Sequence, residues 1–127
     1  MRGLFAGMRD PVSLEVFTKD AQNDSYNEAV IRFARDLDRL GDKVKVSFHK
    51  IGEERSEELK VFRSPTILIE PDKYPIRYTG APLGEEARTF IGTIMLISKG
   101  ESGLSEISLA LLATLEETRH IRVFVSP

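Results

Sequence analysis

The sequence predicts a single α/β domain in which helices flank a mixed four-stranded sheet. Two observations lead to this class. Strand-like alternation and helical periodicity follow one another along the chain, and two strand-like runs near its middle are joined by a short turn. With 127 residues, of which 41% are hydrophobic, the chain is long enough and apolar enough to build one core.

Seven elements are expected in the first hundred residues, in the order strand, helix, strand, helix, strand, strand, helix. Their predicted ranges are 13–18, 26–40, 44–51, 54–62, 65–70, 76–80 and 84–99. The first strand alternates in polarity, and the long helix that follows carries its apolar residues on one face with a period of 3.6. Ser25-x-x-Glu28 has the spacing of a capping box, and Gly41 is a natural end for that helix.

The later elements complete the sheet. Residues 44–51 alternate like a strand with one buried face, and residues 65–70 form an apolar run suited to a buried central strand. The segment between them, 53–63, mixes charges of both signs and is typical of a solvated helical face. A turn at 70–73 then returns the chain as the hairpin strand 76–80. Two strand–helix–strand steps favour parallel pairing with right-handed crossovers, and the hairpin adds an antiparallel strand.

Residues 101–127 continue beyond this unit. Apolar residues at helical spacing predict a further amphipathic helix, and they are Leu104, Ile107, Leu111, Leu112 and Leu115. Residues 121–127 read as another strand. It is similar to 14–18, with Val-Phe at the same place in each, which indicates either an internal repeat or a coincidence between two short apolar strands. An unpaired strand invites pairing with another copy, so a homodimer through this strand or the last helix is expected.

Composition excludes several classes of function. A net charge of -2 without a basic cluster argues against nucleic acid as a partner. No apolar run approaches the ~18 residues of a membrane span, and the N-terminus does not have the pattern of a signal peptide, so a cytoplasmic protein is expected. No cysteine is present, which excludes disulfides, thiolate nucleophiles and cysteine metal sites. The histidines, His49 and His120, lie far apart in sequence and are expected to be packing or surface residues, so no metal site is predicted.

Several short motifs recur in a recognisable order. They are Pro11-Val12, Val16-Phe17, Arg63-Ser64-Pro65-Thr66 and, most specific, Arg77-Tyr78-Thr79-Gly80-Ala81-Pro82-Leu83-Gly84-Glu85-Glu86. With them, nearly the whole chain resembles the first thioredoxin fold of tandem-thioredoxin proteins. These are the archaeal-type protein disulfide oxidoreductases and the N-terminal module of the alkyl hydroperoxide reductase flavoprotein subunit; a thioredoxin-reductase-like fusion is a third alternative. The resemblance implies a thioredoxin-like three-layer sandwich.

The resemblance also places a Cys-x-x-Cys at the start of the first helix, where the helix N-terminus favours a thiolate. Counted from Val16-Phe17, this slot falls on Asn23, Asp24, Ser25 and Tyr26, none of which can exchange disulfides. Asn23, Asp24 and Ser25 are instead good helix-capping residues. A nucleophilic Ser25 would need a general base, and no histidine lies near it in sequence, so capping is preferred. The flavoprotein-subunit module also lacks cysteines in its first fold.

Two further residues are singled out by the resemblance. Pro65 matches the groove proline that faces the redox pair and is usually cis, although from sequence alone a trans proline opening a strand remains the alternative. Glu86 matches a carboxylate that lies toward the junction of the two folds, where it could tune the thiols of the second. The alternative for Glu86 is an acid stabilised by the dipole in the first turn of a helix.

These inferences lead to three hypotheses. The first is a redox-inactive thioredoxin-like domain, residues 1–100, with residues 101–127 as the connecting helix and first strand of a second thioredoxin fold whose Cys-x-x-Cys follows. The complete protein would be a disulfide oxidoreductase or reductase passing electrons to a peroxiredoxin or thioredoxin-type partner. FAD and NAD(P)H would belong to a fused or partner reductase. The second hypothesis is a free-standing module that docks peptides or proteins, and the third is a structural or dimerising domain.

Overall fold

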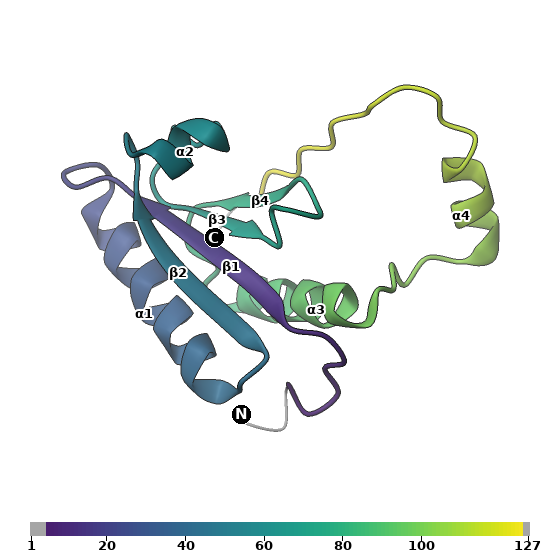
Figure 1. Cartoon of the computed structure of the whole chain (residues 1–127), viewed down its shortest axis with the longest axis horizontal. Helices are drawn as coiled ribbons and strands as arrows, with labels where there is room; N and C mark the ends of the chain where they lie inside the picture. Colours follow the sequence, from purple (N-terminus) through teal and green to yellow (C-terminus); the bar gives the residue numbers. More distant parts are fainter. Residues whose placement is uncertain (1–4, 126–127) are drawn as a thin grey trace.

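The computed structural model describes residues 5–125 and contains four strands and four helices within that range. Figure 1 shows the elements, whose bounds are β1 Val12–Thr18, α1 Asp24–Leu40, β2 Val44–Lys50, α2 Glu54–Glu58, β3 Thr66–Ile69, β4 Ile76–Thr79, α3 Glu85–Lys99 and α4 Glu106–Leu112. All seven elements expected before residue 100 are therefore present, in the expected order.

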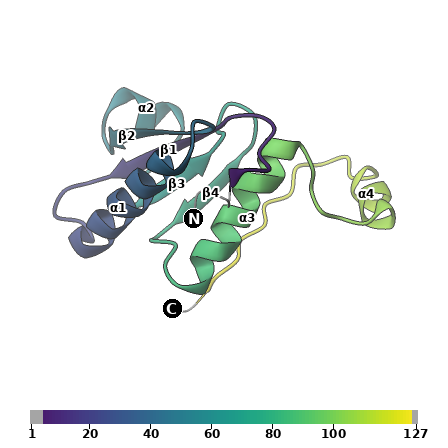
Figure 2. The ribbon, with the colours of Figure 1, turned by 90° about the horizontal axis from the view of Figure 1, so that it is seen from below.

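The strands form one mixed sheet in the order β2-β1-β3-β4. β1 pairs with β2 in parallel, and β3 pairs antiparallel with both β1 and β4. Figure 2 shows three layers, with α1 and α3 on one face of the sheet and the short α2 on the other. The predicted three-layer α/β architecture with a four-stranded mixed sheet is confirmed.

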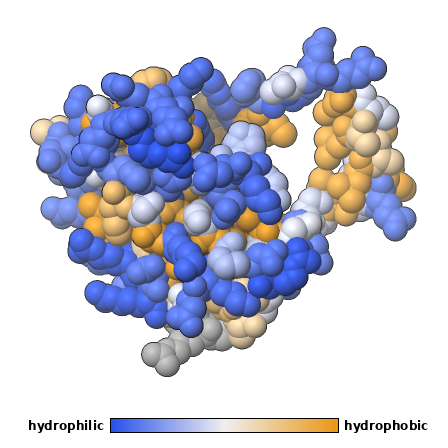
Figure 3. Space-filling view, in the orientation of Figure 1, coloured by the Kyte–Doolittle hydropathy of each residue, from blue (hydrophilic) through white to orange (hydrophobic). Residues whose placement is uncertain are grey.

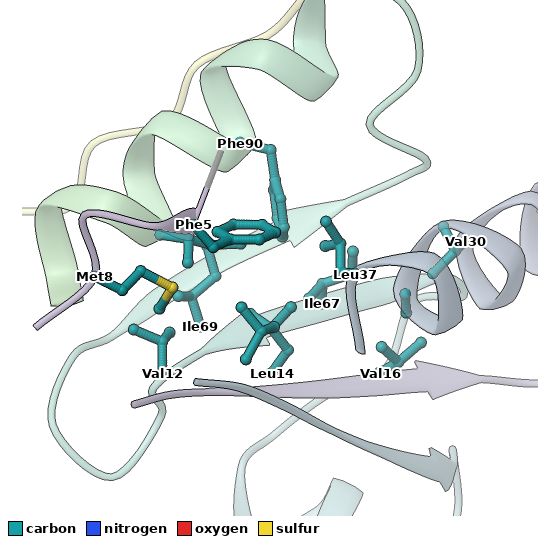
Figure 4. Close-up of a cluster of buried hydrophobic side chains, with 13 residues drawn as sticks. Phe5, Met8, Val12, Leu14, Val16, Val30, Leu37, Ile67, Ile69 and Phe90 are labelled. Atoms are coloured by element: carbon teal, nitrogen blue, oxygen red, sulfur yellow. The ribbon is translucent and has the colours of Figure 1, made fainter. Parts of the chain in front are cut away.

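Alternation along the strands divides the buried residues between two cores. The larger core lies under α1 and α3, and Figure 4 shows its side chains from β1 and β3 meeting those of the helices. Its fully buried strand residues are Val12, Leu14, Val16, Val44, Ile67 and Ile69. The smaller core, on the α2 face, consists of Phe17, Val61 and Leu68, with Ile51 and Leu59 packed against it. The central strands β1 and β3 are therefore buried on both faces.

One predicted pairing is wrong. The second strand–helix–strand step does not produce a parallel neighbour, because β3 runs antiparallel to β1 and is not adjacent to β2. The chain enters β3 from the same end of the sheet at which β2 ends, and β3 then lies between β1 and β4.

Several boundaries also differ from prediction. α2 stops at Glu58 because the chain turns through a positive φ of 55° at Lys60, which brings Val61 into the smaller core at 1% exposure. The last predicted helix is present as α4, over a shorter range. The predicted strand over 121–127 is not formed at 121–125, since no described segment lies beside it to share backbone hydrogen bonds. Its last two residues lie outside the described range.

Candidate functional site: the cysteine-free redox slot

The slot predicted from Val16-Phe17 lies at the start of α1. Asn23 immediately precedes the helix in the left-handed region, with φ 57° and ψ 46°, and Asp24 and Ser25 occupy its first turn. The predicted capping by these side chains is wrong, because no side-chain hydrogen bond caps α1. Asp24 instead accepts a hydrogen bond from the backbone N–H of Ala21, 2.8 Å away. The capping box of Ser25 and Glu28 therefore does not form, since Ser25 lies inside the helix.

Amide side chains tie this slot to the loop before β3. Asn23 Nδ2 donates to the carbonyl oxygen of Ser64 at 2.9 Å, and the buried Ser64 hydroxyl donates to Asn27 Oδ1 at 2.7 Å. The same hydroxyl accepts from the N–H of Lys19 at 2.8 Å. Asn27 Nδ2 in turn donates to the carbonyl oxygens of Lys19 and Gln22, at 3.0 and 2.8 Å. We call these five residues the slot network; it holds the loop before α1 in one conformation.

A third loop completes the site. The Ser64–Pro65 peptide bond is cis, as the resemblance implies, and the N–H of Gly80 donates to the carbonyl oxygen of Pro65 at 2.9 Å. The start of α1, the loop before β3 and the loop after β4 are thus linked by hydrogen bonds. Each loop also presents an exposed apolar side chain, and these are Tyr26, Phe62 and Leu83, at 51%, 70% and 49% exposure.

The chemistry available at this site is limited. The sequence contains no thiol. Within the described part of the chain, the Ser25 hydroxyl forms no hydrogen bond with a histidine or carboxylate that could activate it, so it lacks the general base that a serine nucleophile needs. The three loops meet around cis-Pro65 and contain no thiol.

No protein-family model matches the sequence, and no curated protein does. Among solved structures, a protein disulfide oxidoreductase from Aeropyrum pernix K1 aligns with a TM-score of 0.78 and 27% identity, over 90% of this chain and 51% of that one. The alkylhydroperoxide reductase AhpF from Enterococcus faecalis aligns with a TM-score of 0.74 and 16% identity, over 90% of this chain and 56% of that one. Its separately solved NTD_N/C domain gives a TM-score of 0.69 and 18% identity, over 84% and 53% of the two chains.

The chain has a thioredoxin fold. The sheet order and the helices on both faces agree with these alignments. The chain spans about half the length of the solved chains that it matches. Its fold is therefore related to that of a disulfide oxidoreductase and of the N-terminal domains of a peroxide-reducing system.

Glu86 lies in the first turn of α3 of this thioredoxin fold. It accepts a hydrogen bond from the Tyr78 hydroxyl on β4, and the Tyr78 ring packs edge-on against Phe90 with centroids 5.7 Å apart. Burial and the neighbouring Glu86 carboxylate raise the pKa of Tyr78 above its ordinary value. The carboxylate of Glu86 thus joins the hairpin strand to the last core helix. Its predicted influence on the thiols of a second fold stays a prediction.

The sequence did not single out a second polar site, on the α2 face of the thioredoxin fold. Glu15 on β1 has a side chain only 10% exposed, and both of its oxygens accept hydrogen bonds from Arg55, from Nε and Nη2, at 2.7 Å. His49 Nε2 lies 3.0 Å from Glu15 Oε1, and its ring stacks on Phe17 with centroids 4.9 Å apart. Arg55 also reaches Asp72, at 3.3 Å, in the β3–β4 turn. The Glu15 carboxylate raises the pKa of Arg55 above its ordinary value.

This cluster corrects the prediction that segment 53–63 presents only a solvated face, because Arg55 turns inward from α2. One feature of the sequence could have predicted the Glu15 cluster. Glu15 is an acid in the middle of a strand whose neighbours are apolar, and a carboxylate buried in this way needs a cationic partner. No group of three or more metal-ligating side chains occurs among residues 5–125, and no helix in that range is long and apolar enough to cross a membrane.

Proposed function

We propose that this thioredoxin-fold domain is a redox-inactive support for an adjacent thiol–disulfide oxidoreductase module in a longer protein. The observation that carries the proposal is the slot network: cis-Pro65 lies beside the start of α1, while Asn23, at the first position of the predicted redox slot, is held by a hydrogen bond to Ser64. A scaffold retained without its reactive group is suited to shaping access to a neighbour's thiols.

The comparisons support this proposal at the level of fold. The similar proteins from Aeropyrum pernix and Enterococcus faecalis are named as a disulfide oxidoreductase and an alkylhydroperoxide reductase, and the chain covers 51% and 56% of them. In the proposed arrangement, residues 1–100 form the supporting domain, and residues 101–127 connect to a second thioredoxin fold. Electrons would pass from that fold to a disulfide or to a peroxiredoxin or thioredoxin-type partner in the cytoplasm. FAD and NAD(P)H would be bound by a fused or partner reductase.

The coding sequence after residue 127 tests the arrangement directly. We expect it to continue into a second α/β unit with a Cys-x-x-Cys; a stop codon, or a continuation without this motif, would contradict the proposal. In the longer protein, changing both of those cysteines to serine should abolish disulfide reduction. Deleting residues 1–100 should lower kcat/KM, because the support and its groove are lost, while leaving a reducible disulfide in the second fold.

The 127-residue chain by itself should show no disulfide-reductase activity above background with dithiothreitol as the electron source. An insulin-turbidity assay beside an active thioredoxin makes the comparison, and turnover by this chain would overturn the redox-inactive assignment. The reason is elementary, since thiol–disulfide exchange requires a thiolate and the chain has no cysteine.

A second candidate function is a docking module that binds an extended peptide in the groove without redox chemistry. The observation that favours it is the exposure of Tyr26, Phe62 and Leu83 on the three linked loops, since exposed aromatic side chains are common at recognition sites. Replacing Phe62 by Ala should then weaken capture of a bound peptide at least tenfold. The matched control is Phe48→Ala on β2, an exposed phenylalanine outside these loops.

A further inference from the structure

The outer strand β2 leaves one edge of its backbone unpaired within residues 5–125 (Figure 1). It pairs with β1 alone, in a parallel register that is continuous over its whole length. The carbonyl oxygen of Lys43, just before the strand, and the N–H of Ile51, just after it, both bond to β1. Because backbone groups alternate in direction along a strand, those of Val44, Val46 and Phe48 point away from the sheet. In the described part of the chain, no hydrogen bond reaches the outward groups of Val46 and Phe48.

Side chains beside this edge are apolar on one face of the sheet and cationic on both. On the α1 face, Phe48 is 45% exposed, and the Arg35 guanidinium lies over its ring, 5.7 Å from the centroid. The hollow on the outer surface of α1 beside it is lined by Glu28, Ile31, Arg32, Arg35, Asp36 and Arg39. Lys45 and Ser47 point to the opposite face, because side chains alternate along a strand, and both are exposed. Figure 3 shows hydrophobic side chains between hydrophilic ones on the side of the molecule that carries α1 and β2.

Positive charge at this edge is only partly neutralised. Residues 43–50 contain lysines but no acidic residue, whereas the whole chain has a net charge of -2. Lys50 forms an ion pair with Asp20 at 2.9 Å. No ion pair within the described range involves Lys45 or Arg35. The edge therefore favours an anionic partner.

We propose that the outer edge of β2 binds an extended, acidic segment of a partner protein, which adds to the sheet as a fifth strand. In this mode of recognition, backbone hydrogen bonds to the outward groups of Val46 and Phe48 supply affinity, and side chains supply specificity. β2 has 7 residues and spans about 23 Å at ~3.3 Å per residue, which is room for a strand of equal length. The alternation of side chains then sets the pattern of the partner. It has carboxylates beside Lys45 on one face, and apolar side chains beside Val46 and Phe48 on the other.

A second copy of β2 is a poorer occupant of this edge than an acidic strand. Lysines on an edge strand discourage pairing with the same strand of another copy, because like charges are brought together. A glutamate or aspartate beside Lys45 gains from the same charge. Binding at this edge does not depend on the proposed redox role, because Lys45, Phe48 and Arg35 lie outside the three loops around cis-Pro65.

Fluorescence anisotropy with a labelled peptide tests the charge preference. An octapeptide that alternates glutamate and valine should bind the whole chain at least tenfold more tightly than one that alternates lysine and valine. Lys45→Glu should weaken binding of the glutamate peptide at least tenfold, because it reverses the charge beside the added strand. The matched control, Arg88→Glu, makes the same kind of change at an exposed position on α3 and should leave binding unchanged. Absence of binding, equal affinity for both peptides, or equal loss in both variants would overturn the proposal.

N-methylated peptides test for strand addition, as opposed to attraction by charge alone. An added strand directs the N–H groups of alternate residues toward β2 and the others toward solvent. Methylating either the valine or the glutamate nitrogens of the glutamate peptide therefore gives two peptides of equal charge, of which one should bind at least tenfold more weakly than the other. Equal affinities of the two contradict the proposal. So does a dimer of the chain that excludes the peptide from this edge, since a second copy is then the occupant.

Discussion

At the residue scale, Ser64 determines how the slot is held. Its hydroxyl both donates to Asn27 and accepts from the Lys19 N–H, and its carbonyl oxygen accepts from Asn23. Ser64 and Asn27 are 3% and 6% exposed, so water cannot readily replace these hydrogen bonds. A buried polar group that loses its partner costs more than the bond itself contributed. The network is therefore expected to rigidify the loop before α1.

Replacing Asn27 by Ala should lower the free energy of unfolding by about 1–3 kcal/mol, because it removes the acceptor of the Ser64 hydroxyl proton and the amide that donates to the carbonyl oxygens of Lys19 and Gln22. Urea titration followed by circular dichroism measures the change. The matched control is Ser25→Ala in the same helix turn, which should change stability by less than about 0.5 kcal/mol because Ser25 does not cap the helix. A loss of about 1 kcal/mol or more with Ser25→Ala would restore the capping interpretation.

Tyr78 gives a prediction that depends on pH. Its pKa is raised in the folded state by burial and by Glu86, so the native protein keeps the phenol protonated where the unfolded chain loses its proton. The contribution of this pKa shift to the free energy of unfolding is fully present below about pH 10, the pKa of tyrosine in the unfolded chain. It is lost as the pH rises above that value. Ultraviolet titration should show a tyrosine that ionises late. Tyr78→Phe should abolish that late phase, whereas Tyr26→Phe, at an exposed position, should leave it in place.

At the scale of elements, α2 is the smallest helix and depends most on side chains for its position. Arg55 connects it to Glu15 on β1 and to Asp72 in the hairpin turn. Arg77 on β4 donates to the carbonyl oxygens of Leu59 and Lys60 at 2.9 and 3.0 Å, just beyond the end of the helix. A five-residue helix has little stability of its own. These charged contacts and the smaller core therefore hold it on the sheet.

Arg55→Ala should destabilise the fold by about 2 kcal/mol, because Glu15 remains largely buried with only His49 beside it. Hydrogen exchange should increase first in residues 54–61, which the arginine anchors. Lys50→Ala removes an exposed ion pair with Asp20 and serves as the control, with an expected change below about 0.5 kcal/mol. If both variants lower the free energy of unfolding by the same amount, burial does not make the Glu15 cluster more stabilising than an exposed ion pair.

At the scale of the whole molecule, the chain consists of a packed body and a C-terminal arm, residues 104–125. The body ends at Gly100, which adopts the left-handed conformation that stops α3, and every residue in both hydrophobic cores lies before it. The arm contributes no buried side chain within the described range. The body is therefore expected to fold without the arm.

Deleting residues 101–127 should change the free energy of unfolding, measured at low protein concentration, by less than about 1 kcal/mol, because no core contact is lost. Urea titration followed by circular dichroism makes the measurement. Unfolding of the shortened chain at room temperature would show that the arm belongs to the body.

The sequence by itself determined the class of fold, the order of the first seven elements and the start of the first helix close to Asn23. It could do so because these depend on local signals: the period of the apolar residues, the end of α1 at Gly41, and the spacing from Val16-Phe17 to Asn23. The cysteine-free composition likewise excluded thiol chemistry without any coordinates.

Only the tertiary structure decided how those elements are joined and which polar side chains meet. The antiparallel direction of β3 is set by its pairing with β1 and β4, and the partners of Glu15 come from β2 and α2, up to 40 positions away. Asp24 and Ser25 are residue types that commonly cap helices, but hydrogen bonds to neighbouring and distant loops compete for the groups at the start of α1. Capping propensity is a local preference of about 1 kcal/mol, and such contacts outweigh it. The start of α1 near residues 23–26 was thus predictable from the sequence, whereas the slot network that fixes it to the loop before β3 was not.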